Sequence, residues 1–283
     1  MNLVLKSMLL LFSISILNDA EAQNTQVKSG VKWNIVLIMA DDMGWKDLGC
    51  MGSNYYETPF IDQLAREGLL FTDAYAAAPV CLPTRAAMMT GKTPARLHMT
   101  AVFDRDESKM PLLPPDWKNT LPHGEYTLAE RLKKIGYKTA IMGKWHLGPT
   151  EEYWPKNHGF DENMGAWESG RPASYFSPYK NPKLPDGPVG EYLTDRLAKE
   201  AVTFINSRED DPFFLYLPFY TPHLPLEAPA TSIKEFEGKK ADGQQKNPVY
   251  AAMISQLDKA VGKVRNALRQ NGLADNTIII FTS

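Results

Sequence analysis

The sequence has few cysteines, no block of basic residues and no apolar run long enough to cross a membrane. Only 2 of its 283 residues are cysteine, too few for a scaffold held together by disulfides. The formal net charge is -2, and Lys and Arg do not cluster, so the sequence lacks the basic stripe typical of nucleic-acid binding. It also lacks internal repeats and low-complexity segments. With 43% hydrophobic residues it can build a sizeable core.

The first 22 residues have the pattern of a secretory signal peptide. Met1–Lys6 carries one positive charge, residues 8–17 are apolar, and Ala20-Glu21-Ala22 has the small-x-small spacing of a cleavage site. The apolar run is shorter than the ~20 residues that a bilayer requires, which argues against a membrane anchor. We therefore expect cleavage after Ala22. The mature chain is expected to be exported, either to the periplasm or to the medium, without stable membrane association.

Strand-like and helix-like patterns alternate along residues 23–283. This alternation predicts one α/β domain with a mostly parallel sheet sandwiched by helices. The apolar patterns predict strands over residues 34–40, 69–77, 212–220 and 276–283, and one ending near residue 142. They predict helices over residues 58–68, 84–89, 127–136, 191–206 and 248–270. Residues 169–190 are rich in Pro, Gly, Tyr and Ser, which predicts a loop or lid.

Acidic, basic and histidine residues, whose side chains often act in catalysis, follow three of the predicted strands. Asp41 and Asp42 follow the first strand, Lys144 and His146 follow the strand near residue 142, and His223 follows the strand over 212–220. Taken singly, each has a structural explanation, such as a turn, a helix cap or a solvated loop. In an open α/β sheet, however, the ligand site lies outside the carboxyl ends of the strands. Their coincidence at one edge therefore favours a catalytic site.

One of the two cysteines lies in a compact motif, PVCLPTRAAMMTG, in which Cys81, Pro83 and Arg85 form Cys-x-Pro-x-Arg. The predicted helix that follows would point backbone N–H groups and a positive dipole at the thiol. A disulfide between Cys50 and Cys81 is the default expectation for an exported chain, because exported compartments are oxidising. The motif favours a reactive Cys81 over that disulfide.

Four motifs make the sequence similar to the formylglycine-dependent sulfatases of the alkaline-phosphatase-like superfamily. CLPTRAAMMTG resembles the sulfatase signature, ADDMGW the first metal-binding turn, GKWHLG the Lys/His loop, and PHLP the later histidine. The resemblance runs over residues 33–283 and implies the N-terminal catalytic domain of that fold. It also implies conversion of Cys81 to formylglycine by a maturation enzyme. The activity it implies is arylsulfatase-like: hydrolysis of sulfate monoesters of small molecules or carbohydrates, with sulfated glycans favoured.

The resemblance implies a role for each candidate catalytic residue. Modified Cys81 would be the nucleophile that attacks sulfur. Arg85 and Lys144 would stabilise that nucleophile and the charge that develops on the sulfate. His146 would take a proton from the nucleophile when sulfate leaves, and His223 would protonate the leaving oxygen.

A divalent cation is also implied by the resemblance. Asp41, Asp42 and modified Cys81 would hold Ca²⁺, with Mg²⁺ as the alternative. In the family, further metal ligands and a second lysine follow the strand that resembles residues 276–283, and a small C-terminal domain comes later. Because the sequence ends at Ser283, the resemblance predicts an incomplete metal site in residues 23–283. Weak Ca²⁺ binding and negligible turnover are the corresponding expectations for residues 23–283 alone.

Two other functions remain open from the sequence. Relatives with the same modified cysteine act on phosphorus, so a phosphodiesterase or phosphonate monoester hydrolase is one alternative. The other is an inactive secreted protein that binds sulfated glycans. The sequence also suggests residues that contact the substrate, by stacking on a sugar ring or by pairing with a sulfate group. They lie in and beside the predicted loop and are Trp167, Arg171, Tyr175 and Tyr179.

Overall fold

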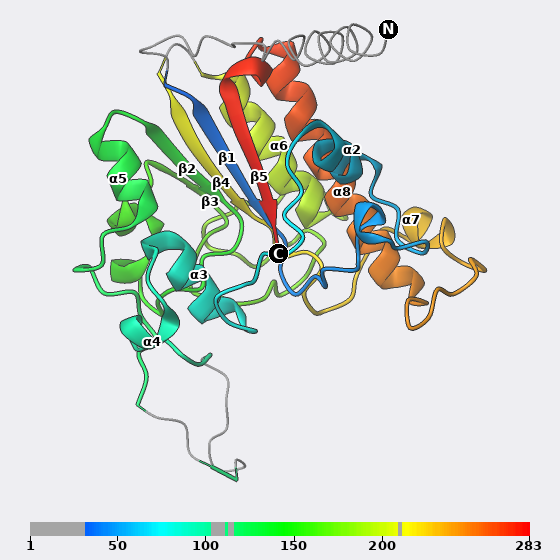
Figure 1. The fold of residues 1–283 in the computed structure, drawn as a ribbon, viewed down its shortest axis with the longest axis horizontal. Helices are drawn as coiled ribbons and strands as arrows, with labels where there is room; N and C mark the ends of the chain where they lie inside the picture. The colour runs from blue at the N-terminus through cyan, green and yellow to red at the C-terminus, as the bar shows by residue number, and fades with distance from the viewer. Residues whose placement is uncertain (1–31, 103–110, 113–115, 209–210) are drawn as a thin grey trace, which may run out of the picture. The chain divides into compact units, whose positions relative to one another are not determined.

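A parallel five-stranded sheet, with strand order β3-β2-β4-β1-β5, lies at the centre of the molecule (Figure 1). The strands are β1 Asn34–Met39, β2 Lys138–Met142, β3 Glu162–Met164, β4 Phe213–Pro218 and β5 Thr277–Thr282. This computed structural model describes residues 32–102, 111–112, 116–208 and 211–283. The predicted signal peptide, residues 1–22, lies outside the described residues. The predicted α/β fold with a parallel sheet is confirmed.

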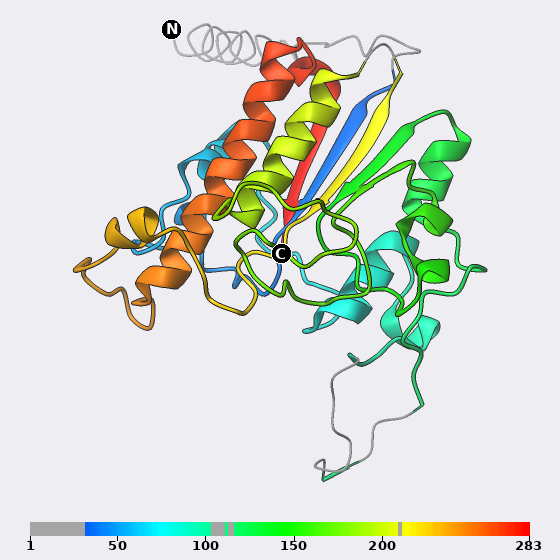
Figure 2. The ribbon, with the colours of Figure 1, turned by 180° about the vertical axis from the view of Figure 1, so that it is seen from behind.

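Helices cover the sheet on both faces, as Figures 1 and 2 show from opposite sides. Helices α6 and α8 pack on one face, where α2 and α7 pack against α8. Helices α3 and α5 lie on the other face, with α4 against α3. The α-helices are α2 Pro59–Glu67, α3 Cys81–Thr90, α4 Pro94–Leu97, α5 Leu128–Lys134, α6 Leu193–Asn206, α7 Ala230–Lys234 and α8 Pro248–Gln270. Short 3₁₀ helices are η1 Gly49–Met51, η3 Glu151–Tyr153, η4 Pro155–His158 and η5 Ala274–Asn276. None of the described helices is long and apolar enough to span a membrane.

The apolar run of β1 serves two cores, because successive side chains of a strand point to opposite faces. Val36 and Ile38 are fully buried in the core on the α6 and α8 side. Leu37 and Met39 belong to the second core, which contains residues of α3. Because the strand is covered on both faces, all its residues after Asn34 are apolar, and this explains the apolar run in the sequence.

Two predicted helices are found with nearly their predicted bounds because their ends carry clear signals. Helix α2 starts after Thr58 with a proline at its first position and stops before Gly68. Helix α8 matches residues 248–270, and the side chain of Asn247 caps it by accepting hydrogen bonds from the backbone N–H groups of Val249 and Tyr250 at 2.9 and 3.2 Å.

The strand predicted over residues 69–77 is wrong, because this segment forms no strand. Its apolar side chains are exposed: Leu69 by 86%, Phe71 by 74% and Tyr75 by 89%. The apolar residues of this segment predicted a strand, but a strand forms only where a neighbour supplies hydrogen bonds. Within the described chain, β5 pairs with β1 alone, and residues 69–77 do not pair with its other edge.

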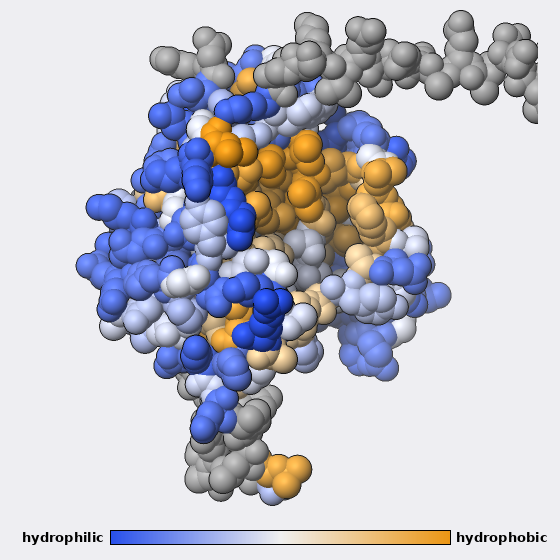
Figure 3. Space-filling model, turned by 60° about the vertical axis from the view of Figure 1, so that its left-hand side comes forward, coloured by the Kyte–Doolittle hydropathy of each residue, from blue (hydrophilic) through white to orange (hydrophobic). Residues whose placement is uncertain are grey.

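One face of β5 is uncovered as well. Ile278 and Ile280 are 46% and 45% exposed, whereas Leu37, the register partner of Ile280 on β1, is buried. Figure 3 shows a broad hydrophobic area on one face of the molecule. The exposed edge strand carries no charge and no proline, the two features that usually prevent edge strands from pairing with other chains.

We expect this edge to make residues 23–283 self-associate in solution. Replacing Ile280 by Lys removes an apolar contact worth about 1.5 kcal/mol and adds a charge, so the association constant should fall roughly tenfold. Val189→Lys is the matched control, because Val189 is 94% exposed in a loop far along the chain from β5. Sedimentation velocity measures the effect, and equal association by both variants would contradict it.

Candidate active site

A glycine sets the end of β2 against the end of β4. Gly143 has φ 128°, and a β-carbon there would lie 2.0 Å from the carbonyl oxygen of Pro218. Only glycine permits that close approach. Lys144 then donates its backbone N–H to the same Pro218 oxygen at 2.7 Å. The result is that Lys144 enters the protein interior, where its side chain is fully buried.

Three charged side chains meet beneath the sheet edge. The Asp41 carboxylate accepts a hydrogen bond from Lys144 Nζ at 2.6 Å and another from Arg85 Nη2 at 3.0 Å. Arg85 Nη1 also donates to the Lys144 carbonyl oxygen at 3.0 Å. All three side chains are at most 3% exposed. Buried charges persist only when they are paired and hydrogen-bonded, and this ion cluster satisfies that requirement.

The ion cluster carries one surplus positive charge. Burial by itself would raise the pKa of Asp41, but the charges of Lys144 and Arg85 outweigh it and hold that pKa below its usual range. Asp41 is therefore ionised at neutral pH and balances only one of its two cationic partners. Arg85 Nε also has no hydrogen-bond partner within the described chain. The site thus has positive charge and an unused donor at its base.

Cys81 and His146 lie next to each other above the ion cluster. Cys81 is the first residue of α3, and its Sγ is 3.3 Å from Nδ1 of His146. His146 is held with a positive φ of 62°, an uncommon conformation for a residue other than glycine. Burial, together with the charges of Lys144 and Arg85, lowers the pKa of His146 to about 3. The imidazole is therefore neutral at physiological pH.

Asp42 and His223 form a second, more exposed pair. His223 Nε2 lies 3.3 Å from Oδ2 of Asp42, and the two side chains are 19% and 57% exposed. The other ring nitrogen, Nδ1, is 2.8 Å from the carbonyl oxygen of Leu224. Asp42 also has a positive φ, 60°, which turns the chain sharply after β1. Asp41 and Asp42 consequently face different surroundings although they are adjacent in sequence.

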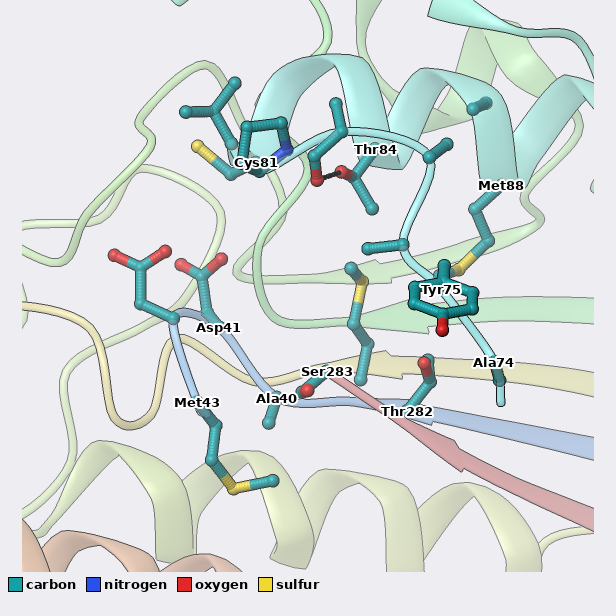
Figure 4. Close-up of a pocket in the computed structure, with 18 of the residues that line it drawn as sticks. Ala40, Asp41, Met43, Ala74, Tyr75, Cys81, Thr84, Met88, Thr282 and Ser283 are labelled. Atoms are coloured by element: carbon teal, nitrogen blue, oxygen red, sulfur yellow. Dashed lines mark hydrogen bonds between the residues drawn. The ribbon is translucent and has the colours of Figure 1, made fainter. Parts of the chain in front are cut away.

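Two cavities meet at Cys81 and Asp42. One, of about 630 Å³, is also lined by His146, His223 and residues 167–171. The other, of about 790 Å³, lies towards the end of β5 and is lined mainly by apolar side chains. In Figure 4, Cys81 and Asp41 lie at one end of this second cavity. The thiol is therefore reachable from both sides.

The structure brings together all the residues predicted from the strand ends and the cysteine motif, namely Asp41, Asp42, Cys81, Arg85, Lys144, His146 and His223. Trp167 and Arg171 line the 630 Å³ cavity, as a substrate contact requires. Sequence reasoning missed Glu168 and Gly170, which line it as well. Neither residue stands in a recognisable motif. The only signal in the sequence is that both lie within three positions of Trp167, which was predicted to contact the substrate.

The predicted substrate contacts Tyr175 and Tyr179 are wrong. Both rings are buried, with exposed fractions of 0% and 2%. The Tyr175 hydroxyl donates to the backbone and that of Tyr179 donates to Glu191, so neither is available to a sugar. In this Pro- and Gly-rich loop the two tyrosine side chains anchor the loop to the protein and do not face the 630 Å³ cavity.

The two cysteines are separate and both are free, so the disulfide between Cys50 and Cys81 is not formed. The backbone N–H of Cys50 donates to Asp62 Oδ1 at 2.8 Å. Burial and the nearby Asp62 carboxylate raise the pKa of the Cys50 thiol to about 11. Cys50 is consequently unreactive, and Cys81 is the thiol that lines a cavity.

The residues of the described chain do not by themselves fit a Ca²⁺ or Mg²⁺ site. No group of three or more His, Cys, Asp or Glu side chains suited to hold a metal occurs in the parts of the chain that the structure describes. Both carboxylate oxygens of Asp41 are already paired, one with Lys144 and one with Arg85, and Asp42 contacts His223. Calcium takes six to eight oxygen ligands, and far fewer are present here.

Comparison with known proteins gives similar relatives over nearly the whole chain. An N-acetylgalactosamine-6-sulfatase of Rattus norvegicus is 36% identical over 275 residues, covering 88% of this chain and 49% of the relative. An arylsulfatase of Hemicentrotus pulcherrimus is 34% identical, covering 89% and 47%. The chain thus spans about half the length of the curated relatives it matches.

Solved structures agree with the fold. The crystal structure of Ps i-CgsB in complex with k-i-k-neocarrahexaose has a TM-score of 0.75 and 33% sequence identity, covering 89% of this chain and 58% of that one. The model of the Sulfatase family matches residues 33–283, which include every residue of the site described above. The chain belongs to the sulfatase family.

Proposed function

We propose that the protein hydrolyses sulfate monoesters of glycans, with a formylglycine formed from Cys81 as the nucleophile. The observation that carries the proposal is the position of Cys81: it opens α3 within the family signature, borders both cavities and lies 3.3 Å from a neutral imidazole. A hydrated aldehyde at this position supplies one hydroxyl to attack sulfur and a second to release the sulfate.

The buried cations hold the sulfate end of the reaction. Lys144 and Arg85 are fixed by Asp41 before substrate arrives, so they need no reorganisation when charge develops on the sulfate oxygens. Because they are almost fully buried, their field acts in a medium that screens it less than water does. No step of this mechanism passes through a metal ion, since the described residues do not complete a metal site.

His146 and His223 each carry out one of the two proton transfers of the reaction. His146 is in contact with position 81, so it is placed to take a proton from the nucleophile. His223 stands at the rim of the 630 Å³ cavity, 19% exposed, where the alcohol part of an ester would leave. Its place suits protonation of the leaving oxygen. Asp42 Oδ2, 3.3 Å from Nε2, keeps the ring oriented.

The cavity and the relatives support a glycan as substrate. Trp167 offers an aromatic surface for a sugar ring and Arg171 a positive charge for a further sulfate or hydroxyl. One relative is named for N-acetylgalactosamine 6-sulfate hydrolysis, and one similar structure contains k-i-k-neocarrahexaose. We extend the proposal to export through residues 1–22 and to a maturation enzyme that recognises the stretch from Cys81 to Arg85.

Sulfate release from 4-nitrophenyl sulfate by the whole gene product, co-expressed with a formylglycine-generating enzyme, tests the proposal. We expect turnover of the sulfate ester to exceed that of 4-nitrophenyl phosphate and of a phosphonate monoester by at least about a hundredfold, and Cys81→Ala to abolish it. The phosphonate arm is included because a Phosphonate Monoester Hydrolase of Agrobacterium radiobacter shares the fold, with a TM-score of 0.60 at 18% identity. Preferred turnover of a phosphorus ester would refute the sulfatase assignment, and so would binding of a sulfated oligosaccharide without release.

The modification of Cys81 is testable independently of turnover. In the tryptic peptide that contains Cys81, we expect mass spectrometry to show one oxygen in place of one sulfur and two hydrogens. Cys50 provides the control in the same digest, because it lies outside the motif and should remain a thiol. Protein in which both residues are unmodified thiols, despite an active maturation enzyme, would remove the nucleophile from the proposal.

A further inference from the structure

Residues 167–175 form an irregular segment that is nevertheless fixed at both ends. It contains no helix and no regular strand. Just before it, the Ala166 N–H donates to Asn163 Oδ1 at 2.9 Å. At its end the Tyr175 N–H donates to Glu227 Oε2 at 2.8 Å. Loops held in this way present their backbone at a defined place, and this segment lies against both histidines of the candidate site.

The first contact is between Gly170 and the ring of His146. A β-carbon at position 170 would lie 2.5 Å from Cε1, 2.7 Å from Nε2 and 2.9 Å from Nδ1 of His146. No side chain fits there unless the imidazole moves. The backbone of His146 is held by the same segment, because its N–H donates to the Trp167 carbonyl oxygen at 3.2 Å. The segment therefore fixes the distance between the imidazole and Cys81.

The second contact is between Tyr175 and the turn that carries His223. The Tyr175 ring is fully buried, and its hydroxyl lies 2.9 Å from the carbonyl oxygen of Tyr220 and 2.8 Å from that of His223. The His223 N–H donates to the same Tyr220 oxygen at 2.9 Å. One hydroxyl thus joins both ends of this short turn, and with it the position of the His223 ring.

We infer that residues 167–175 are a positioning segment that places both proton-transferring histidines, His146 through Gly170 and His223 through Tyr175. Neither Gly170 nor Tyr175 is proposed to touch the reacting atoms, so both are positioning residues. The inference rests on the proposed function for its catalytic meaning. The geometry itself is tested on the unmodified thiol form, which needs no maturation and no turnover.

Alkylation of Cys81 by iodoacetamide reports the placement of His146. Nδ1 of His146 lies 3.3 Å from Sγ, within hydrogen-bond contact of the thiol, so moving the ring by Gly170→Ala should slow alkylation about threefold or more. Peptide mass spectrometry measures the alkylated fraction of Cys81 and compares it with that of the slowly reacting Cys50 in the same molecule. Gly124→Ala is the matched control, since a β-carbon there meets no atom within 4 Å. An unchanged or faster rate in folded Gly170→Ala would overturn the inference.

A double-mutant cycle separates positioning from general damage. When His146 is replaced by Ala there is no ring left to displace, so adding Gly170→Ala should change the alkylation rate no further. A second slowing of similar size in the His146→Ala background would show that Gly170 acts by another route, and would overturn this half of the inference.

Tyr175→Phe tests the other end of the segment, and it remains informative if Gly170→Ala does not fold. Loss of its hydroxyl should speed hydrogen exchange of the His223 backbone N–H about fivefold or more. Tyr137→Phe is the control, because Tyr137 is also buried and its hydroxyl donates to the Trp33 carbonyl oxygen, before β1 and so at the other end of the sheet from the turn. Equal exchange in the two variants would overturn the role of Tyr175.

Kinetics of the matured protein give the functional readout. We expect Tyr175→Phe and Gly170→Ala to lower kcat about tenfold with KM nearly unchanged, since misplacing a proton-transfer group affects the chemical step more than binding. A rise in KM alone would contradict positioning. If the matured wild type released no sulfate, the proposed function would fail, while alkylation and exchange would still decide the positioning inference.

Discussion

The buried carboxylate of Asp41 is the centre on which the candidate site depends. It joins three segments that are distant in sequence: the end of β1, helix α3 through Arg85, and the end of β2 through Lys144. Leaving a buried charge without its partner costs about 3–5 kcal/mol, a large part of the stability of a domain. The ion cluster therefore constrains the fold and the chemistry together. Cys81 and His146 take their places because Arg85 and Lys144 are held beneath them.

Backbone geometry supplies what the ion cluster cannot. Gly143 lets β2 close against β4, and positive φ angles at Asp42 and His146 turn the chain so that these side chains face the cavity. Non-glycine residues adopt such angles at a cost, which is met where surrounding contacts enforce them and is common at functional sites. The ends of β1, β2 and β4 place the two aspartates, Lys144 and the two histidines at one edge of the sheet, and α3 brings Cys81 and Arg85 to the same edge.

Much of this arrangement could be predicted from the sequence, because it depends on local patterns. The apolar run of β1, the caps of α8 and the polar residues after each strand all carry their signals within a few positions. The rest depends on partners distant in the chain. Residues 69–77 are apolar enough for a strand but meet no strand edge. Tyr175 was predicted to contact a sugar, but its ring is buried and its hydroxyl donates to backbone carbonyl oxygens. Gly170 carries no motif, since its role exists only against the ring of His146.

A double-mutant cycle between Asp41 and Lys144 tests the central claim most directly, through urea unfolding of residues 23–283. In Asp41→Asn, two buried cations lose their common partner, so removing one of them by Lys144→Met should cost less than it does in the wild type. The account predicts that the double variant is destabilised by about 1–3 kcal/mol less than the sum of the single variants. Lys263→Met, whose exposed ammonium pairs with Asp195, should add to Asp41→Asn without coupling. Additivity of Asp41→Asn and Lys144→Met within about 0.5 kcal/mol would contradict the account.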